Sequence, residues 1–128
     1  MAMNRTIDPD EAWAWCEQAW KQPGEADRLL REQDEHGVDV VLHLFLRWAG
    51  ERHRVELDEA AFSQAQALVR PWREDVIGPV RAVRRGLKQA DGTRARAVRE
   101  LLGQAELQAE RAELEALCAW LEGVGTGP

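Results

Sequence analysis

The chain has 128 residues, of which 45% are hydrophobic and 31% are charged, and this balance predicts one globular domain rather than a disordered chain. The formal net charge of −6 argues against a general binder of nucleic acid or anionic membranes. No signal-peptide segment opens the sequence, and no apolar run approaches the ~20 residues that span a membrane. We therefore expect a cytoplasmic protein with no membrane partner.

The charge is unevenly distributed along the chain. Residues 70–99 carry nine Lys or Arg against three Asp or Glu, which makes this segment +6 and the remainder −12. Opposite charges in one small domain usually pair with each other. Binding of a phosphate-rich partner is the alternative. No set of stacking aromatics or recognition-helix motif accompanies the basic run, so nucleic acid is not the expected partner.

The first half of the chain predicts three helices. Asp8 and Pro9 suit the start of a helix that ends before Pro23-Gly24, and a second helix is expected at about 25–35. Gly37 suits a left-handed cap after it. Asp39 is the predicted cap of a third helix at about 40–51, which is apolar nearly all round and should be the most buried. The β-branched content leaves a strand as the alternative there.

The second half predicts further helices. Asp58 suits a helix cap, and Pro71 and Pro79 should divide residues 59–88 into two or three short pieces. Asp91-Gly92 marks a turn before a long final helix at about 93–122. The predicted fold is an all-α, single-domain bundle of five or six helices with a buried central third helix, spanning 1–128 with residues 1–7 and 123–128 frayed.

The final helix carries two apolar faces. We expect the first to be a small-residue seam for close packing against another helix. The second is a leucine face, which either packs within the subunit or forms a homodimer, and a homodimer is the preferred interpretation. The seam comprises Val98, Leu102, Ala105, Ala109, Ala112, Ala116 and Ala119, and the leucine face comprises Leu107, Leu114, Leu117 and Leu121.

A polar corner precedes the third helix, where four polar residues within 33–39 adjoin a buried segment. Buried polar groups need partners, and Asp34 is expected to pair with Arg81 or Arg84. The corner is either a structural lock between helices or a pocket for a small anionic or polar ligand. The candidate ligand-binding residues are Gln33, Asp34, His36, Asp39, Arg81 and Arg84.

Other chemistry has weaker support in the sequence. Asp39, His43 and His36 could hold a metal ion, but no further motif completes a ligand set, so none is assigned. There is no Gly-rich phosphate loop, and no cofactor is expected. Cys16 and Cys118 lie in apolar helical patterns without a CxxC motif, which favours buried thiols in a reducing compartment over a disulfide.

Two long motifs resemble the signatures of a small bacterial family of all-helical proteins of unknown function. Residues 29–50, LLREQDEHGVDVVLHLFLRWAG, are similar to LxLQDxxGxDVNLLLxxxWLA, and residues 71–88, PWREDVIGPVRAVRRGLK, are similar to PWRxxVxxPLRxxRxxLK. Residues 13–24 and 105–117 also resemble that family's ends. His43 stands where the pattern has Asn, and Glu32 where it has an apolar residue. The resemblance implies no activity or cofactor.

The sequence thus favours a non-enzymatic protein-interaction or regulatory module. The alternative is a small anionic-ligand binder or an enzyme that uses the polar corner at 33–39 with Arg81 and Arg84.

Overall fold

The computed structural model describes residues 6–124, and its regular secondary structure there is entirely helical, which confirms the predicted all-α class. The elements are α1 (Pro9–Trp20), α2 (Glu25–His36), α3 (Val40–His53), α4 (Glu59–Trp72), a π-helical turn η1 (Arg73–Ile77), α5 (Gly78–Gly86) and α6 (Thr93–Gly123).

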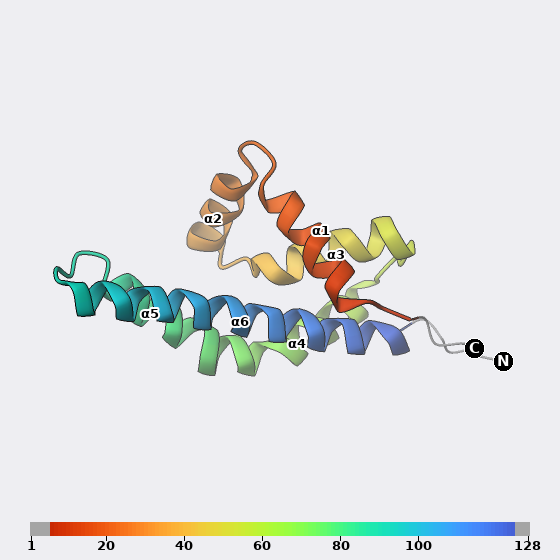
Figure 1. The fold of residues 1–128 in the computed structure, drawn as a ribbon. Helices are drawn as coiled ribbons and strands as arrows, with labels where there is room; N and C mark the ends of the chain where they lie inside the picture. The colour runs from red at the N-terminus through yellow and green to blue at the C-terminus, as the bar shows by residue number, and fades with distance from the viewer. Residues whose placement is uncertain (1–5, 125–128) are drawn as a thin grey trace.

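The helices form a long hairpin with a second group on one side of it. The rod made by α4, η1 and α5 runs antiparallel to α6, and α1, α2 and α3 lie together over one side of this hairpin (Figure 1). Helices α1 and α3 pack on α6, whereas α2 packs on α1 and α3. Helix α2 lies over the end of the hairpin that is formed by α5 and the first part of α6 (Figure 1).

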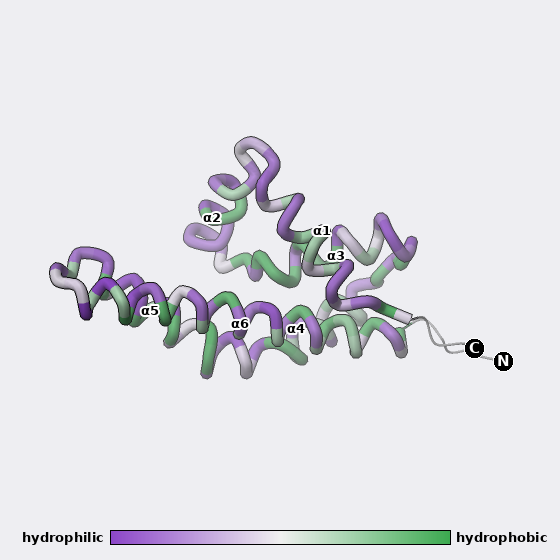
Figure 2. Tube along the Cα trace, viewed as in Figure 1, coloured by the Kyte–Doolittle hydropathy of each residue, from purple (hydrophilic) through white to green (hydrophobic). Residues whose placement is uncertain are grey.

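Helix α3 is the centre of the core, as predicted. Phe45 and Trp48 are fully buried, and they join Ala12 of α1 and leucines of α6 in one hydrophobic cluster. Figure 2 shows the hydrophobic start of α3 facing the hairpin. The caps form where the sequence predicts them: Asp39 Oδ1 accepts a hydrogen bond from Leu42 N, and Gly37 has a φ of 65°.

The two apolar faces of α6 are not buried in the way that the sequence predicts. Leu114, Leu117 and Leu121 are fully buried within the subunit, so they are not available to a second subunit, and only Leu107 is exposed. The predicted small-residue seam was wrong, because Ala109 is its only buried member and its other alanines are exposed. The face of α6 that meets α1 and α3 is the leucine face. Whether the protein dimerises stays a prediction.

The two prolines do not break the rod. Helix α4 continues through Pro71, and the π-helical turn absorbs the irregularity before α5 begins at Gly78. Gly78 N–H donates to Arg73 O five residues back, and a Cβ at Gly78 would lie 3.1 Å from that oxygen. This tight turn therefore favours glycine, and it sets the position of Arg73 in the site described below.

The ends of the described chain lie beside each other. Ile7 is buried in the core, and its backbone N–H donates to Glu122 Oε2 at 3.2 Å. Fraying was predicted for 1–7 and 123–128, of which 1–5 and 125–128 lie outside the described residues. Within the described part, residue 7 is packed and α6 extends to Gly123.

Candidate functional site

A cleft of about 330 Å³ lies between the group α1–α3 and the hairpin formed by η1, α5 and α6. We call it the central cleft. Its volume is at the low end of the ~300–1,000 Å³ that is typical of small-molecule sites. Its polar groups come mainly from α3, η1, α5 and α6. Its apolar walls include Trp13, Trp20, Leu30, Val41, Leu44 and Leu107.

Four of the six predicted site residues line the central cleft, namely Gln33, Asp39, Arg81 and Arg84. The other two do not. His36 is exposed at the end of α2, with Nε2 4.0 Å from Glu35 Oε2.

The predicted pairing of Asp34 with Arg81 or Arg84 was wrong. Asp34 is exposed and lies 3.6 Å from Arg85 Nη2, an ion pair at the edge between α2 and α5. The sequence places Asp34 correctly on α2, but the α2 face that carries it looks outward.

The buried partners of the α5 arginines come from α6. Arg81 Nε donates to Glu106 Oε1 at 2.8 Å and Arg81 Nη2 to Glu110 Oε1 at 3.2 Å. Arg84 Nε donates to Glu106 Oε2 at 2.5 Å. Burial opposes ionisation of Glu106, but the hydrogen bonds from Arg84 and Arg81 outweigh it and lower its pKa. These charge-assisted bonds bind α5 to α6.

Asp39 has two roles at the start of α3. Its Oδ1 caps the helix, and its Oδ2 lies 3.2 Å from Arg73 Nε of η1. The contact with Arg73 is an ion pair without hydrogen-bond geometry. Asp39 Oδ2 is buried, and it receives no hydrogen bond from residues 6–124.

Glu113 of α6 is the most unusual group in the central cleft. Only 2% of its surface is exposed, and neither carboxyl oxygen accepts a hydrogen bond from the described residues. Burial, followed by hydrogen bonding to Asp39 and the negative charge of Asp39, raises the pKa of Glu113 to about 10. Glu113 is therefore protonated at neutral pH.

We call the neighbouring carboxyl groups of Asp39 and Glu113 the acid pair. A protonated Glu113 can donate its O–H to Asp39, which satisfies one acceptor of the pair. The other Glu113 oxygen still has no donor, and leaving a buried acceptor unpaired costs about 1–3 kcal/mol. The unpaired oxygen can therefore accept a hydrogen bond from a molecule in the cleft.

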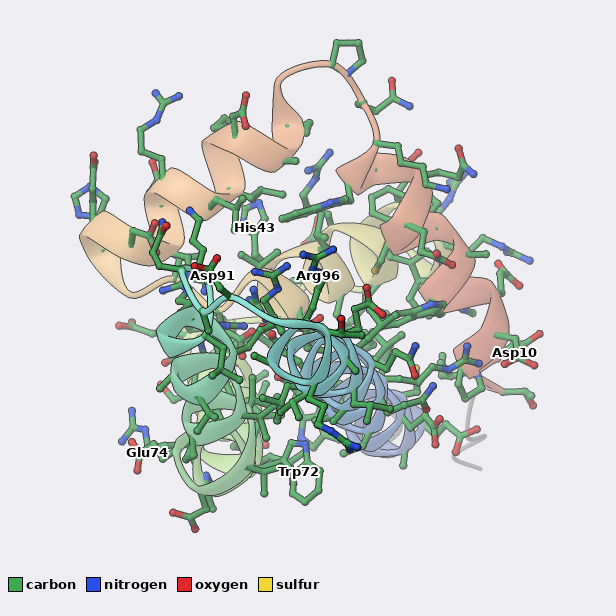
Figure 3. All side chains as sticks on the ribbon, turned by 60° about the vertical axis from the view of Figure 1, so that its left-hand side comes forward. Asp10, His43, Trp72, Glu74, Asp91 and Arg96 are labelled. Carbon is green, nitrogen blue, oxygen red and sulfur yellow. The ribbon has the colours of Figure 1, made fainter. Side chains whose placement is uncertain are left out.

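A second hollow, of about 500 Å³, lies on the other side of Asp39 and Arg73, between α3 and α4. His36 and His43 line it. Figure 3 shows His43 pointing from α3 towards α2. Burial lowers the pKa of His43, so it is neutral at pH 7. Within the described part of the chain, no three His, Cys, Asp or Glu side chains are placed to hold a metal ion.

The two cysteines are buried thiols. Cys16 lines the central cleft, and burial raises the pKa of both Cys16 and Cys118 to about 12. A thiol with such a pKa is protonated at neutral pH and is a poor nucleophile.

Sequence reasoning missed the three glutamates of α6 because charged residues on a helix are usually solvated. One signal was present. Glu106, Glu110 and Glu113 are spaced by four and three residues, and the same spacing continues to the buried Leu117 and Leu121. Carboxylates on the buried face of a helix indicate either ion pairs or a site.

These features define an all-helical, single-domain protein with a buried acid pair in an apolar cleft. The chain belongs to the family described as "Protein of unknown function (DUF2390)", whose model matches residues 11–117, and this confirms the resemblance found in the motifs. Neither a curated protein nor a solved structure matches the chain. Among residues 6–124, no helix combines the length and apolar character needed to cross a membrane.

Proposed function

We propose that this protein binds a small molecule in the central cleft, with an apolar body against the walls and a hydrogen-bond donor directed at the acid pair. The observation that carries the proposal is Glu113, a buried carboxyl group with no donor for either oxygen, in the lining of a cleft of ligand size. Buried polar groups in proteins nearly always have hydrogen-bond partners. A donor group on a bound ligand would supply the partner that Glu113 lacks.

The shape and chemistry of the walls support the same proposal. Trp13 and Trp20 of α1 face Leu30 of α2 and Leu107 of α6 around the cleft, and these side chains can cover an apolar molecule. Few but well-placed polar groups among apolar walls are typical of small-molecule sites.

A small anion, the alternative suggested by the arginines, has less support. Arg81 and Arg84 are already held by Glu106 and Glu110, and Arg73 faces Asp39. An anion would have to displace these carboxylates from short charge-assisted bonds. The unpaired groups of the cleft are acceptors, which favour a donor.

The test is binding of 2-naphthol, a small fluorescent dye with an apolar ring body and one O–H donor, to the purified protein and to two matched variants. Leu107 lines the cleft and is 51% exposed, so Leu107→Trp should obstruct the opening without disturbing the core. Gln108→Trp adds similar bulk on the same helix at an exposed residue outside the cleft.

We expect the native protein and Gln108→Trp to bind the dye alike, and Leu107→Trp to bind at least about tenfold more weakly, a loss of about 1.4 kcal/mol. Equal affinity of the two variants, or no dye binding by the native protein, would refute the proposal.

We also propose a second function, association with another copy of the chain, in keeping with the expected interaction module. The supporting observation is a set of exposed hydrophobic side chains on the hairpin, including Leu68 and Trp72 of α4, Val83 of α5 and Leu101 of α6. Trp72 points away from α2 and α3 (Figure 3). Exposed apolar surface on a small protein favours an interface.

Sedimentation velocity at micromolar concentration tests this association. We expect a dimer for the native protein and a monomer for a Val83→Glu, Leu101→Glu double variant, because a buried unpaired charge opposes association. A monomeric native protein would refute the proposal. The cytoplasm remains the proposed compartment, and the buried thiols Cys16 and Cys118 support it.

A further inference from the structure

The geometry points to an organic cation as the ligand of the central cleft. We propose a primary amine with an apolar body, whose ammonium group lies between Glu113 and Asp39 and replaces the proton that these carboxyl groups share. This inference rests on the proposed binding function and specifies the chemical class of the ligand.

The first argument is the number of unpaired acceptors. Three buried oxygens at one place have no donor among residues 6–124: Glu113 Oε1, Glu113 Oε2 and Asp39 Oδ2. An ammonium group has three N–H donors and no acceptor. A single shared proton can satisfy only part of this set. An alcohol offers one donor and adds an acceptor, whereas an anion offers no donor.

The second argument is the charge around Glu113. Asp39 from the start of α3 and Glu110 from α6 both disfavour a further negative charge there, and Arg73 from η1 only partly compensates. Arg81 of α5 is turned to Glu106 and Glu110. The group most favoured between the two carboxyls is therefore positive. Without a ligand, a proton meets this need.

The third argument is the opening and walls of the cleft. Trp20 of α1 lies in its lining, and tryptophan rings attract organic cations through their faces, whereas the ring of Trp13 already has the Arg111 guanidinium 5.6 Å from its centroid. Glu17 of α1 and Lys21, which follows α1, are exposed lining residues of opposite charge, and the exposed Arg85 of α5 in the same lining is paired with Asp34. An alkyl or aryl body would lie against Leu107.

Binding then involves a proton exchange that balances. The amine enters as R–NH₃⁺, and the Glu113 carboxyl group releases its proton to solvent and becomes a carboxylate. No covalent bond to the ligand forms. One proton leaves per ligand bound, so affinity should rise about tenfold per pH unit while Glu113 remains protonated in the unliganded protein.

The test uses three probes of equal chain length: n-octylamine, n-octanol and octanoate. Isothermal titration calorimetry of the native protein between pH 6 and pH 8 should show the amine binding at least about tenfold more tightly than the alcohol at pH 8, with octanoate weakest. Titrations in buffers of different ionisation enthalpy should show one proton released per amine bound.

Glu113→Gln supplies the variant and Glu115→Gln the matched control. The glutamine keeps the side-chain volume but cannot become an anion, so the amine-to-alcohol affinity ratio should fall at least about tenfold and proton release should disappear. Glu115 lies on the same helix with an exposed side chain outside the cleft, and its replacement should leave the ratio unchanged.

The outcomes separate this inference from the proposed function. If octanol and 2-naphthol bind in the cleft but octylamine binds no more tightly, the cleft remains a binding site and the cation is refuted. If octanoate binds most tightly, the arginines determine the ligand and the inference is overturned. If neither 2-naphthol nor any octyl probe binds, the proposed function itself fails.

Discussion

Replacing Glu113 by glutamine is expected to stabilise the protein at neutral pH, although it removes a buried ionisable side chain. The carboxyl group is almost fully buried, and it has no cation closely paired with it to hold it ionised. In the unfolded chain the same carboxyl group is exposed to water and ionises normally. Folding at pH 7 therefore requires Glu113 to take up a proton.

The size of the effect follows from the two pKa values. The pKa of Glu113 rises from its ordinary value of 4.5 to about 10 on folding. Between these values the folded state holds one more proton than the unfolded state, so this group's contribution to stability is fully present below pH 4.5 and is lost as pH rises towards 10. At about 1.4 kcal/mol per pH unit, the cost at pH 7 reaches about 3 kcal/mol.

Glutamine is neutral at every pH and avoids this cost. Its amide can donate to Asp39, but with a different geometry from the carboxyl O–H, so we expect a gain of about 1–3 kcal/mol at pH 7. Urea denaturation at pH 5, 6, 7 and 8 measures it. The difference between variant and native protein should grow steadily with pH, and Glu115→Gln should follow the native curve because its side chain is exposed.

Two results would refute this reasoning. Parallel stability curves for Glu113→Gln and the native protein across pH 5–8 would show that Glu113 does not change protonation on folding. A variant less stable than the native protein at pH 7 would show that Glu113 is an ionised, stabilised carboxylate.

Three further substitutions test the contacts around the site. Asp34→Ala should lower stability by less than about 1 kcal/mol, because its ion pair with Arg85 is exposed, and a loss of several kcal/mol by urea denaturation would contradict the structure. Glu106→Ala should cost about 2–4 kcal/mol in the same assay, since it removes the shared partner of the α5 arginines, and an unchanged midpoint would rule out that network. Trp72→Phe should lower stability by about 1–2 kcal/mol, because the indole N–H donates to Ala109 O at 2.8 Å across α4 and α6, and an unaltered Tm would argue against this bond.

Local signals predicted the helices well because helix ends depend on neighbouring residues. The caps at Asp8, Asp39 and Asp58 and the left-handed Gly37 all appear where the sequence places them. The prolines were harder to interpret. A π-helical turn around Gly78 keeps the rod continuous, and its closure depends on backbone spacing that residue types alone do not reveal.

The candidate site was predicted only in part. The polar corner led to Asp39, and the basic segment led to Arg81 and Arg84, all of which line the central cleft. Their partners were not predicted because Glu106 and Glu113 come from α6, far away in sequence. A glutamate on a long amphipathic helix gives no local sign of whether it faces water or the core.

The sequence by itself determined the all-helical class, the order and approximate bounds of the helices, and the burial of α3, since each follows from short-range periodicity and caps. Only the tertiary structure decided which face of α6 meets α1 and α3, because that helix has apolar residues on two sides. This choice buries Leu114 and Leu117 and exposes most of the alanines. The same choice carries Glu113 into the cleft beside Asp39, where loss of solvent raises its pKa and creates the acid pair.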